Sequence, residues 1–170
     1  CDIPEITYGF GGAIEWKGFD VSIFFQGTAR VSLFEEGSTI VPFSSGYKNN
    51  DGFLRGVMEN RWTVDNPDPN ARYPRTIRPS DALDNNNTKK SSFWVRNAAF
   101  LRLKNAEIGY TFPKRWMEKM AIQNLRLYVS GVNLLTWAPD VHLFDPDLGS
   151  GDGRKYPPTR VFNVGLNINF

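Results

Sequence analysis

The stretch FNVGLNINF, residues Phe162–Phe170, decides the fold, because apolar and polar side chains alternate along it without a break. A β-strand turns successive side chains to opposite faces, so this period of two predicts a strand with one apolar and one polar face. Glycine and asparagine occupy the polar face. The apolar face holds Phe162, Val164, Leu166, Ile168 and Phe170.

The same period begins at Ile6 and runs through two segments joined by Lys17-Gly18. A two-residue connection ending in glycine between alternating segments is typical of a tight β-hairpin. Phe24 is the exception to the alternation in the second segment. The apolar face of the predicted hairpin holds Ile6, Tyr8, Phe10, Ile14, Trp16, Phe19, Val21, Ile23 and Phe25.

Two further strands are predicted, at about 94–112 and 124–137. The third strand alternates cleanly only in its final part, because Phe100, Leu101 and Leu103 put apolar groups on both faces. The phase of the fourth strand becomes unclear after Gly131, where a β-bulge would fit. Between the two strands, residues 113–122 form a short connection with room for one helical turn.

The connections alternate in length: about 2, about 60, about 10 and about 20 residues. The two long ones cover about 30–92 and 138–158 and are rich in Pro, Gly and Asp. We expect both to lack regular structure, apart from a short helix between Asp51 and Trp62. Short turns on one side and long loops on the other are typical of outer-membrane β-barrels, whose long loops are extracellular.

Composition agrees with such a barrel. The chain has 20 Lys+Arg and 18 Asp+Glu, without the basic excess that a nucleic-acid partner usually requires. Aromatic residues make up 14% of the chain and suit a membrane girdle. The mean hydropathy is −0.40, as expected for strands that are apolar only at every second position.

The predicted fold class is therefore all-β, with five antiparallel strands belonging to a larger transmembrane barrel. Five strands cannot close a membrane barrel, and an open edge in lipid leaves backbone groups unpaired at several kcal/mol each. The alternative is a soluble or surface β-sandwich binding module, which would bury its apolar face between two sheets.

Several ordered blocks resemble the SusC/RagA family of TonB-dependent transporters. Residues 99–113 (AFLRLKNAEIGYTFP) resemble the family block LRLKN…LGYTLP, and residues 124–136 (NLRLYVSGVNLLT) resemble LRVYVSGQNLFT. The hairpin at 6–27 resembles the segment YKGFDLSVFFQG, and FDPD at 144–147 and the final strand also fit. One departure is Val132, where the family often has Gln.

The resemblance implies the last strands of a 22-stranded barrel in the outer membrane. It also implies import of glycans or peptides, with a SusD-like surface lipoprotein as lid and the TonB complex as energy source. The plug domain and the TonB-contacting segment would lie outside this chain. The bilayer lipid is the remaining expected partner, and the resemblance implies nutrient uptake of the kind found in Bacteroidetes.

Three sets of residues are candidate functional residues. Asp20, Gln26, Glu107 and Arg126 are predicted to face the lumen or the plug. Trp62, Tyr73 and Arg75 of the first long loop, and Trp94 at its return to the next strand, are candidates for contact with a substrate or lid. The alternative is that they pack the loop on itself or on the lid protein. The alternating residues Phe162, Val164, Leu166, Ile168 and Phe170 resemble the signal that the barrel-assembly machinery reads, and the same residues suit an aromatic belt.

No catalytic residue is predicted, because His142 is the only histidine and has no nucleophile or metal-ligand pattern around it. No cofactor is expected. Asp145, Asp147 and Asp152 form a weak Ca²⁺ candidate, since their spacing does not match an EF-hand. Cys1 is the only cysteine, so an internal disulfide is not possible. It is either a lipid-bearing mature terminus or simply the residue at which this chain begins.

Overall fold

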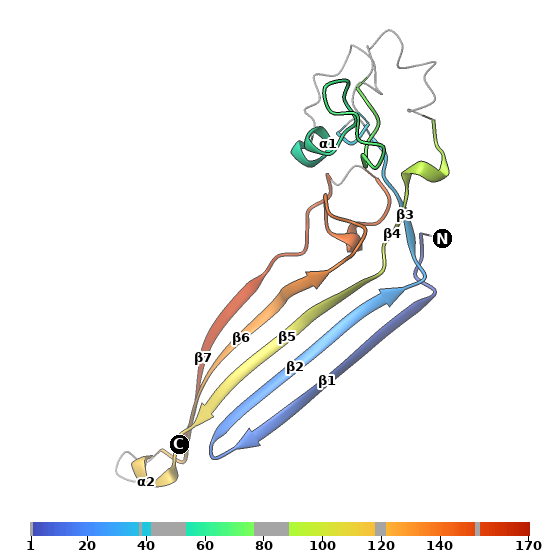
Figure 1. Cartoon of the computed structure of the whole chain (residues 1–170). Coiled ribbons are helices and arrows are strands. Elements are labelled where there is room, and N and C mark those ends of the chain that lie inside the picture. The colour runs from blue at the N-terminus through green and yellow to red at the C-terminus, as the bar shows by residue number, and fades with distance from the viewer. Residues whose placement is uncertain (1, 38, 42–53, 77–88, 118–121, 152–153) are drawn as a thin grey trace. The chain divides into compact units, whose positions relative to one another are not determined.

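A computed structural model describes residues 2–37, 39–41, 54–76, 89–117, 122–151 and 154–170 (Figure 1). The elements are β1 (Ile6–Trp16), β2 (Phe19–Ala29), β3 (Ser32–Phe34), α1 (Arg55–Glu59), η4 (Ser92–Trp94), β4 (Val95–Asn97), β5 (Phe100–Thr111), α2 (Lys114–Met117), β6 (Asn124–Trp137), η6 (Pro146–Leu148) and β7 (Val161–Asn169).

The chain divides into two compact units. The strand unit comprises Pro4–Arg30, Ala99–Pro139 and Pro158–Phe170. The loop unit comprises the described residues of Cys1–Ile3, Val31–Ala98 and Asp140–Pro157. Each unit contains segments that are far apart in the sequence.

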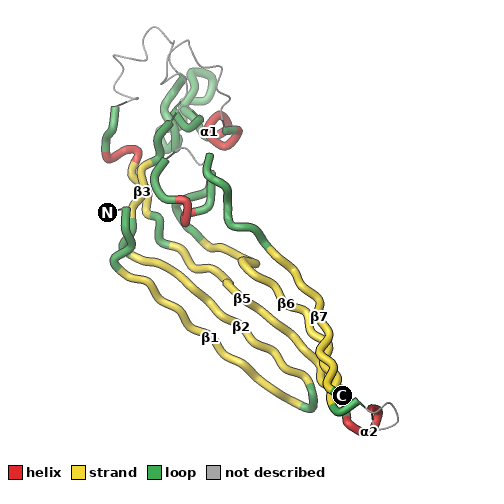
Figure 2. The backbone as a smooth tube through the Cα atoms, turned by 180° about the vertical axis from the view of Figure 1, so that it is seen from behind, coloured by secondary structure: helices red, strands yellow, loops and turns green. Residues whose placement is uncertain are grey.

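The strand unit is a five-stranded antiparallel sheet in the order β1-β2-β5-β6-β7 (Figures 1 and 2). Its cross-strand register joins side chains of like polarity in rows, which confirms the predicted faces. One such row crosses all five strands through Ile14, Val21, Ile108, Val129 and Val164.

The hairpin turn has the backbone that its sequence predicts. Lys17 and Gly18 have φ values of 50° and 89°, and a type I′ turn requires positive φ at both central residues. Gly18 is also confined, because an added Cβ would lie 2.7 Å from the carbonyl oxygen of Thr111. The Thr111 amide donates to the Gly18 carbonyl at 2.7 Å, which ties the turn to the end of β5.

A β-bulge explains the irregular part of β5. Asn105 pairs with Val132 and Leu103 pairs with Leu135, so Lys104 lies opposite two residues of β6. One of these is Asn133, whose φ is +55°. The bulge changes the phase of β5, and Leu103 therefore shares the apolar face although its spacing in the sequence places it on the other face.

The apolar face of the sheet is exposed. Val164 is 75% exposed and Phe162 is 72% exposed, whereas a sandwich would bury such residues against a second sheet. Among the described residues no helix is long and apolar enough to cross a membrane. The sheet is thus apolar toward its surroundings along one whole face.

Phe24, the exception to the alternation, lies on the polar face and covers glycines of β1. An added Cβ on Gly9 would lie 2.9 Å from the Phe24 ring, and one on Gly11 would lie 3.1 Å from it. An aromatic ring over strand glycines fills the space that the missing side chains leave.

The loop unit has an ordinary hydrophobic core. Its buried residues are Ile40, Val41, Val57, Tyr73 and Trp94, with Phe34, Leu54, Leu143 and Phe144 packed against them. The second long loop contributes to this core and also pairs with the first, since the Gly151 amide donates to the Phe34 carbonyl at 3.0 Å. Two stretches that the sequence analysis treated as separate loops therefore fold together.

Two predictions about this region were wrong. The predicted strand at 94–112 is two strands, because β4 pairs with β3 in a two-stranded sheet while β5 pairs with β2 and β6. The stretch 30–92 is not structureless in its described part, since it contains β3, α1 and most of the core. The predicted helical turns are present at α1 and α2.

Candidate functional site

A charged cluster lies on the polar face of the strand unit. Arg126 of β6 donates from Nε to Asp20 Oδ1 at 3.0 Å, and its Nη2 donates to Asp20 Oδ2 and, at 2.6 Å, to Glu107 Oε1. The three residues come from β2, β5 and β6, so one guanidinium joins three strands. Two carboxylates around one permanent cation leave the cluster with a net negative charge.

Gly109 makes this cluster possible. Asp20 pairs directly with Gly109 in the register of β2 and β5, and Arg126 lies beyond β5. An added Cβ on Gly109 would lie 2.6 Å from both the Arg126 guanidinium and the Asp20 carboxylate. The ion pair therefore crosses β5 through the space above a residue without a side chain.

Gln26 lies on the same face, opposite Arg102 of β5. Arg102 is 2% exposed, donates to Thr136 Oγ1 at 3.0 Å, and holds its guanidinium 5.1 Å from the Phe100 ring centre. The sequence analysis missed Arg102, because the bulge that turns it to this face was not located in β5. The described residues of this face thus combine hydrogen-bonding groups with fixed charges.

The four residues predicted to contact a substrate or lid differ in exposure, although the Trp62 amide donates to the Tyr73 carbonyl at 2.9 Å. Tyr73 and Trp94 are 2% and 3% exposed in the core of the loop unit, with ring centroids 6.4 Å apart, so both pack the loop. Trp62 is half-buried and Arg75 is exposed. Burial leaves the first two little surface for a ligand, and contact by Trp62 and Arg75 stays a prediction.

A buried ionic group, also missed from the sequence, ties the loop unit together. Glu35 is 1% exposed and lies between Arg96, whose Nε is 2.9 Å from Oε2, and Arg72, whose Nη2 is 3.6 Å from Oε1. Arg72 also pairs with Asp140 at 3.3 Å, and Asp140 accepts a hydrogen bond from the Asn97 amide at 2.9 Å. Arg72 thus connects the first long loop to the second.

Burial and charge act in opposite directions on the two carboxyls of this group. Burial raises the pKa of Glu35 although Arg96 and Arg72 oppose it. Burial also opposes ionisation of Asp140, but the Asn97 amide and Arg72 outweigh it and lower the pKa of that carboxyl. Neither residue stands out in the sequence, because only tertiary contacts bury Glu35 and bring Arg72 and the Asn97 amide to Asp140.

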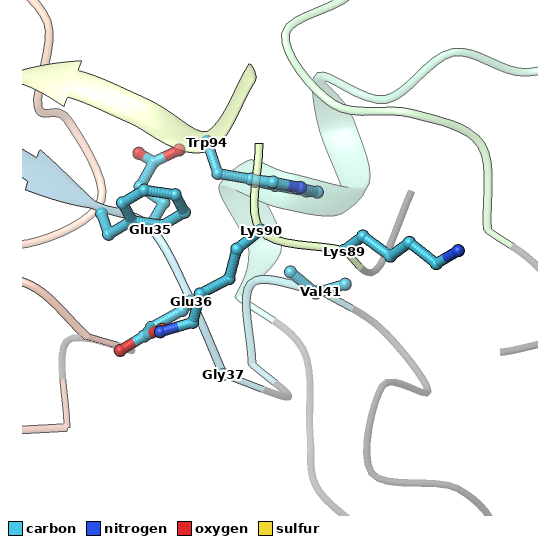
Figure 3. Close-up of a pocket in the computed structure, with 8 residues that line it drawn as sticks. Glu35, Glu36, Gly37, Val41, Lys89, Lys90 and Trp94 are labelled. Carbon is cyan, nitrogen blue, oxygen red and sulfur yellow. The ribbon is translucent and has the colours of Figure 1, made fainter. Parts of the chain in front are cut away.

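Figure 3 shows a pocket in the loop unit beside this group. Lys90 reaches across it to Glu36, with Nζ 2.8 Å from Oε2, while Lys89 extends away. The Lys90 ammonium also lies 5.7 Å from the Phe34 ring centre. The lining residues are Phe34, Glu35, Glu36, Gly37, Val41, Lys89, Lys90 and Trp94.

The Ca²⁺ candidate at Asp145, Asp147 and Asp152 stays a prediction. The Asp145 carboxylate accepts a hydrogen bond from the Asp147 amide at 3.0 Å and so caps η6. Asp152 and Cys1 lie outside the described residues. Within the described ranges no group of three or more His, Cys, Asp or Glu residues is placed to hold a metal ion.

The apolar residues of β7 share one exposed face, from Phe162 to Ile168, and Phe170 follows at 79% exposure. Their register with β6 is regular, with Val164 opposite Val129 and Leu166 opposite Leu127. Their role as an assembly signal stays a prediction.

The sequence of the chain is similar to known receptor sequences over almost its whole length. TonB-dependent receptor P3 of Formosa agariphila is 30% identical over 98% of the chain, and receptor P26 of the same organism is 29% identical over 99%. The chain belongs to the TonB-dependent receptors. It spans only 16% and 17% of the lengths of these two receptors, and no family model matches it.

The structure of this TonB-dependent receptor chain is also similar to solved structures of the RagAB peptide transporter. One is 25% identical over 98% of the chain with a TM-score of 0.68, and the "closed-closed" state is 25% identical over 99% with a TM-score of 0.71. The likeness agrees with the SusC/RagA motifs of the sequence.

Since TonB-dependent receptors are outer-membrane β-barrel proteins, the strand unit is a segment of barrel wall and the protein is located in the outer membrane. The exposed apolar face is accordingly the lipid-facing surface. The alternative of a β-sandwich module is not supported. The total of 22 strands and the position of the plug outside the chain stay predictions.

Proposed function

We propose that this chain is part of the wall and surface loops of a TonB-dependent importer that takes up peptides or oligosaccharides together with a SusD-like lipoprotein lid. The likeness to the RagAB peptide importer over nearly the whole chain carries the proposal, and it favours peptides as the cargo. The relatives are receptors and transporters rather than enzymes, in agreement with the lack of a catalytic group in the sequence.

The two units suit different parts of this function. The strand unit has a continuous apolar face, which suits contact with lipid. Its polar face carries the Arg126 cluster and suits the interior of the barrel. The loop unit is a folded body of its own, which is the form expected of a surface that a lid protein contacts. Energy would come from the TonB complex through segments outside this chain.

The test is uptake by the native host. Cells lacking the receptor gene should lose growth on either a peptide mixture or an oligosaccharide mixture as the sole source, while growth on free amino acids and monosaccharides is retained. Affinity purification of the tagged receptor should recover one surface lipoprotein in equal amount. Unchanged growth and uptake on every oligomer tested would overturn the proposal, as would a receptor purified without any lipoprotein.

A further inference from the structure

Aromatic side chains form a continuous chain at one end of the strand unit. Ring centroids are 4.6 Å apart for Phe19 and Tyr110, 5.0 Å for Tyr110 and Phe112, and 6.1 Å for Phe112 and Trp116. The chain runs from β2 through the end of β5 into α2. Trp116 is 53% exposed, so the aromatic chain ends at the molecular surface.

Three cations lie at the same end of the sheet. The ammonium of Lys17, in the β1–β2 turn, lies 4.7 Å from the ring centre of Trp16, which is 65% exposed on the apolar face. Lys114 and Arg115 are exposed in α2. The hydrogen bond between Thr111 and Gly18 brings the two connections together, and Figures 1 and 2 show both beside the end of β7.

Two acidic side chains described near this end, Glu15 and Asp20, belong to the polar face. They pair across β1 and β2, and Asp20 is held by Arg126. Within the described ranges no ion pair involves Lys17, Lys114 or Arg115. In the sequence, Glu118 and Lys119 follow outside the described residues and offset one another in charge.

We propose that Lys17, Lys114 and Arg115, with Trp16 and Trp116, form a site for the headgroup of an anionic phospholipid. Tryptophan at a membrane–water interface lies at headgroup level, and each nearby Lys or Arg adds about 1 kcal/mol of attraction to an anionic lipid. The site is continuous with the lipid-facing side of the sheet, so a bound lipid places its acyl chains on the apolar face and its phosphate beside the cations.

The inference goes beyond the proposed import function, because it concerns the membrane and not the cargo. It rests on the outer-membrane location. In the orientation expected from the loop lengths, this end of the sheet faces the periplasm. The bound lipid would therefore belong to the periplasmic leaflet of the outer membrane, which consists of phospholipid.

The experiment compares lipids that co-purify with the full receptor. Purified receptor is exchanged into equal amounts of phosphatidylglycerol and phosphatidylcholine with identical acyl chains, and retained lipids are counted by mass spectrometry. The variant carries Lys17→Gln, Lys114→Gln and Arg115→Gln. The matched control carries Arg154→Gln, Lys155→Gln and Arg160→Gln, three exposed cations near the end of the chain's last long connection.

Wild-type receptor should retain phosphatidylglycerol in preference, and the preference should fall about fivefold for each cation removed, the equivalent of about 1 kcal/mol each. Raising the salt concentration should reduce the preference of the wild type for phosphatidylglycerol. At low salt the control variant should keep the wild-type preference. Equal retention of the two lipids by the wild type would overturn the proposal, as would a preference that the triple variant keeps or that the control loses equally. None of these outcomes depends on cargo or lid, so they are independent of the proposed import function.

Discussion

The two units of this chain place their apolar side chains in opposite ways. In the loop unit, Val57 and Tyr73 are almost fully buried, as in a protein dissolved in water. In the strand unit, Val129 and Val164 of the same polarity are exposed across a whole face. One chain is therefore folded for two solvents: hydrophobic burial stabilises the loop unit in water, and lipid contacts the apolar face of the strands.

The largest expected effect is in the loop core. Tyr73→Ala should destabilise the loop unit by about 3–5 kcal/mol, because it removes a buried ring and leaves a cavity. Hydrogen exchange on the receptor in lipid should show faster exchange across 54–76 and unchanged exchange in β5 and β6. Arg75→Ala, at an exposed neighbouring position, is the control. Equal loss of protection in both units would show that they are one cooperative body.

A charge on the lipid-facing side should have the next largest effect. Val129→Arg places a cation on the apolar face and should cost about 2–4 kcal/mol near the bilayer midplane. Ser130→Arg, at the next residue on the polar face, should cost less. Urea unfolding in vesicles, followed by the heat-dependent shift of the gel band, measures both. If the two variants were equally destabilised, the assignment of the faces would be wrong.

The crossing of β5 by the Arg126–Asp20 pair gives a third test. Gly109→Ala should destabilise the strand unit by about 1–3 kcal/mol, because its Cβ would lie 2.6 Å from both charged groups and force the Arg126–Asp20 pair to shift. Gly12→Ala is the matched control, since nothing lies within 4 Å of its added Cβ. The same urea measurement applies, and a Gly109 variant as stable as the control would contradict this geometry.

The smallest effect concerns pH in the loop unit. The folded-state pKa of Glu35 is raised, so its contribution to stability is present below the usual value of 4.5 and is lost as pH rises through the folded-state value. Glu35→Gln should remove this decline, and Glu36→Gln, at the half-buried neighbouring position, should keep it. Opening free energies from hydrogen exchange, corrected for intrinsic rates, can be compared at pH 5 and pH 8. An identical decline in wild type and Glu35→Gln would rule out this residue as its source.

Most of the strand unit could be predicted from local patterns in the sequence. Alternation within a strand is local, and a tight turn at Lys17-Gly18 needs no distant partner, so strands, faces and hairpin could be read from residues a few positions apart. The lumen-facing candidates Asp20, Gln26, Glu107 and Arg126 followed from the same alternation and lie on one face. The family motifs are also local, because each lies within one strand or hairpin, and they pointed to the TonB-dependent receptors.

The fold of the loop unit and the contacts of the charged residues could not be predicted in this way, because they depend on segments that are distant in the sequence. The core of the loop unit joins Val57 and Trp94 to Leu143 of the second long loop. A periodic pattern in the sequence cannot predict a contact between segments so far apart. The bulge at Lys104 and the clearance above Gly109 depend on how neighbouring strands pair. Buried Glu35 looks like any exposed acid until Arg72 and Arg96 surround it, because burial is a property of packing and not of spacing.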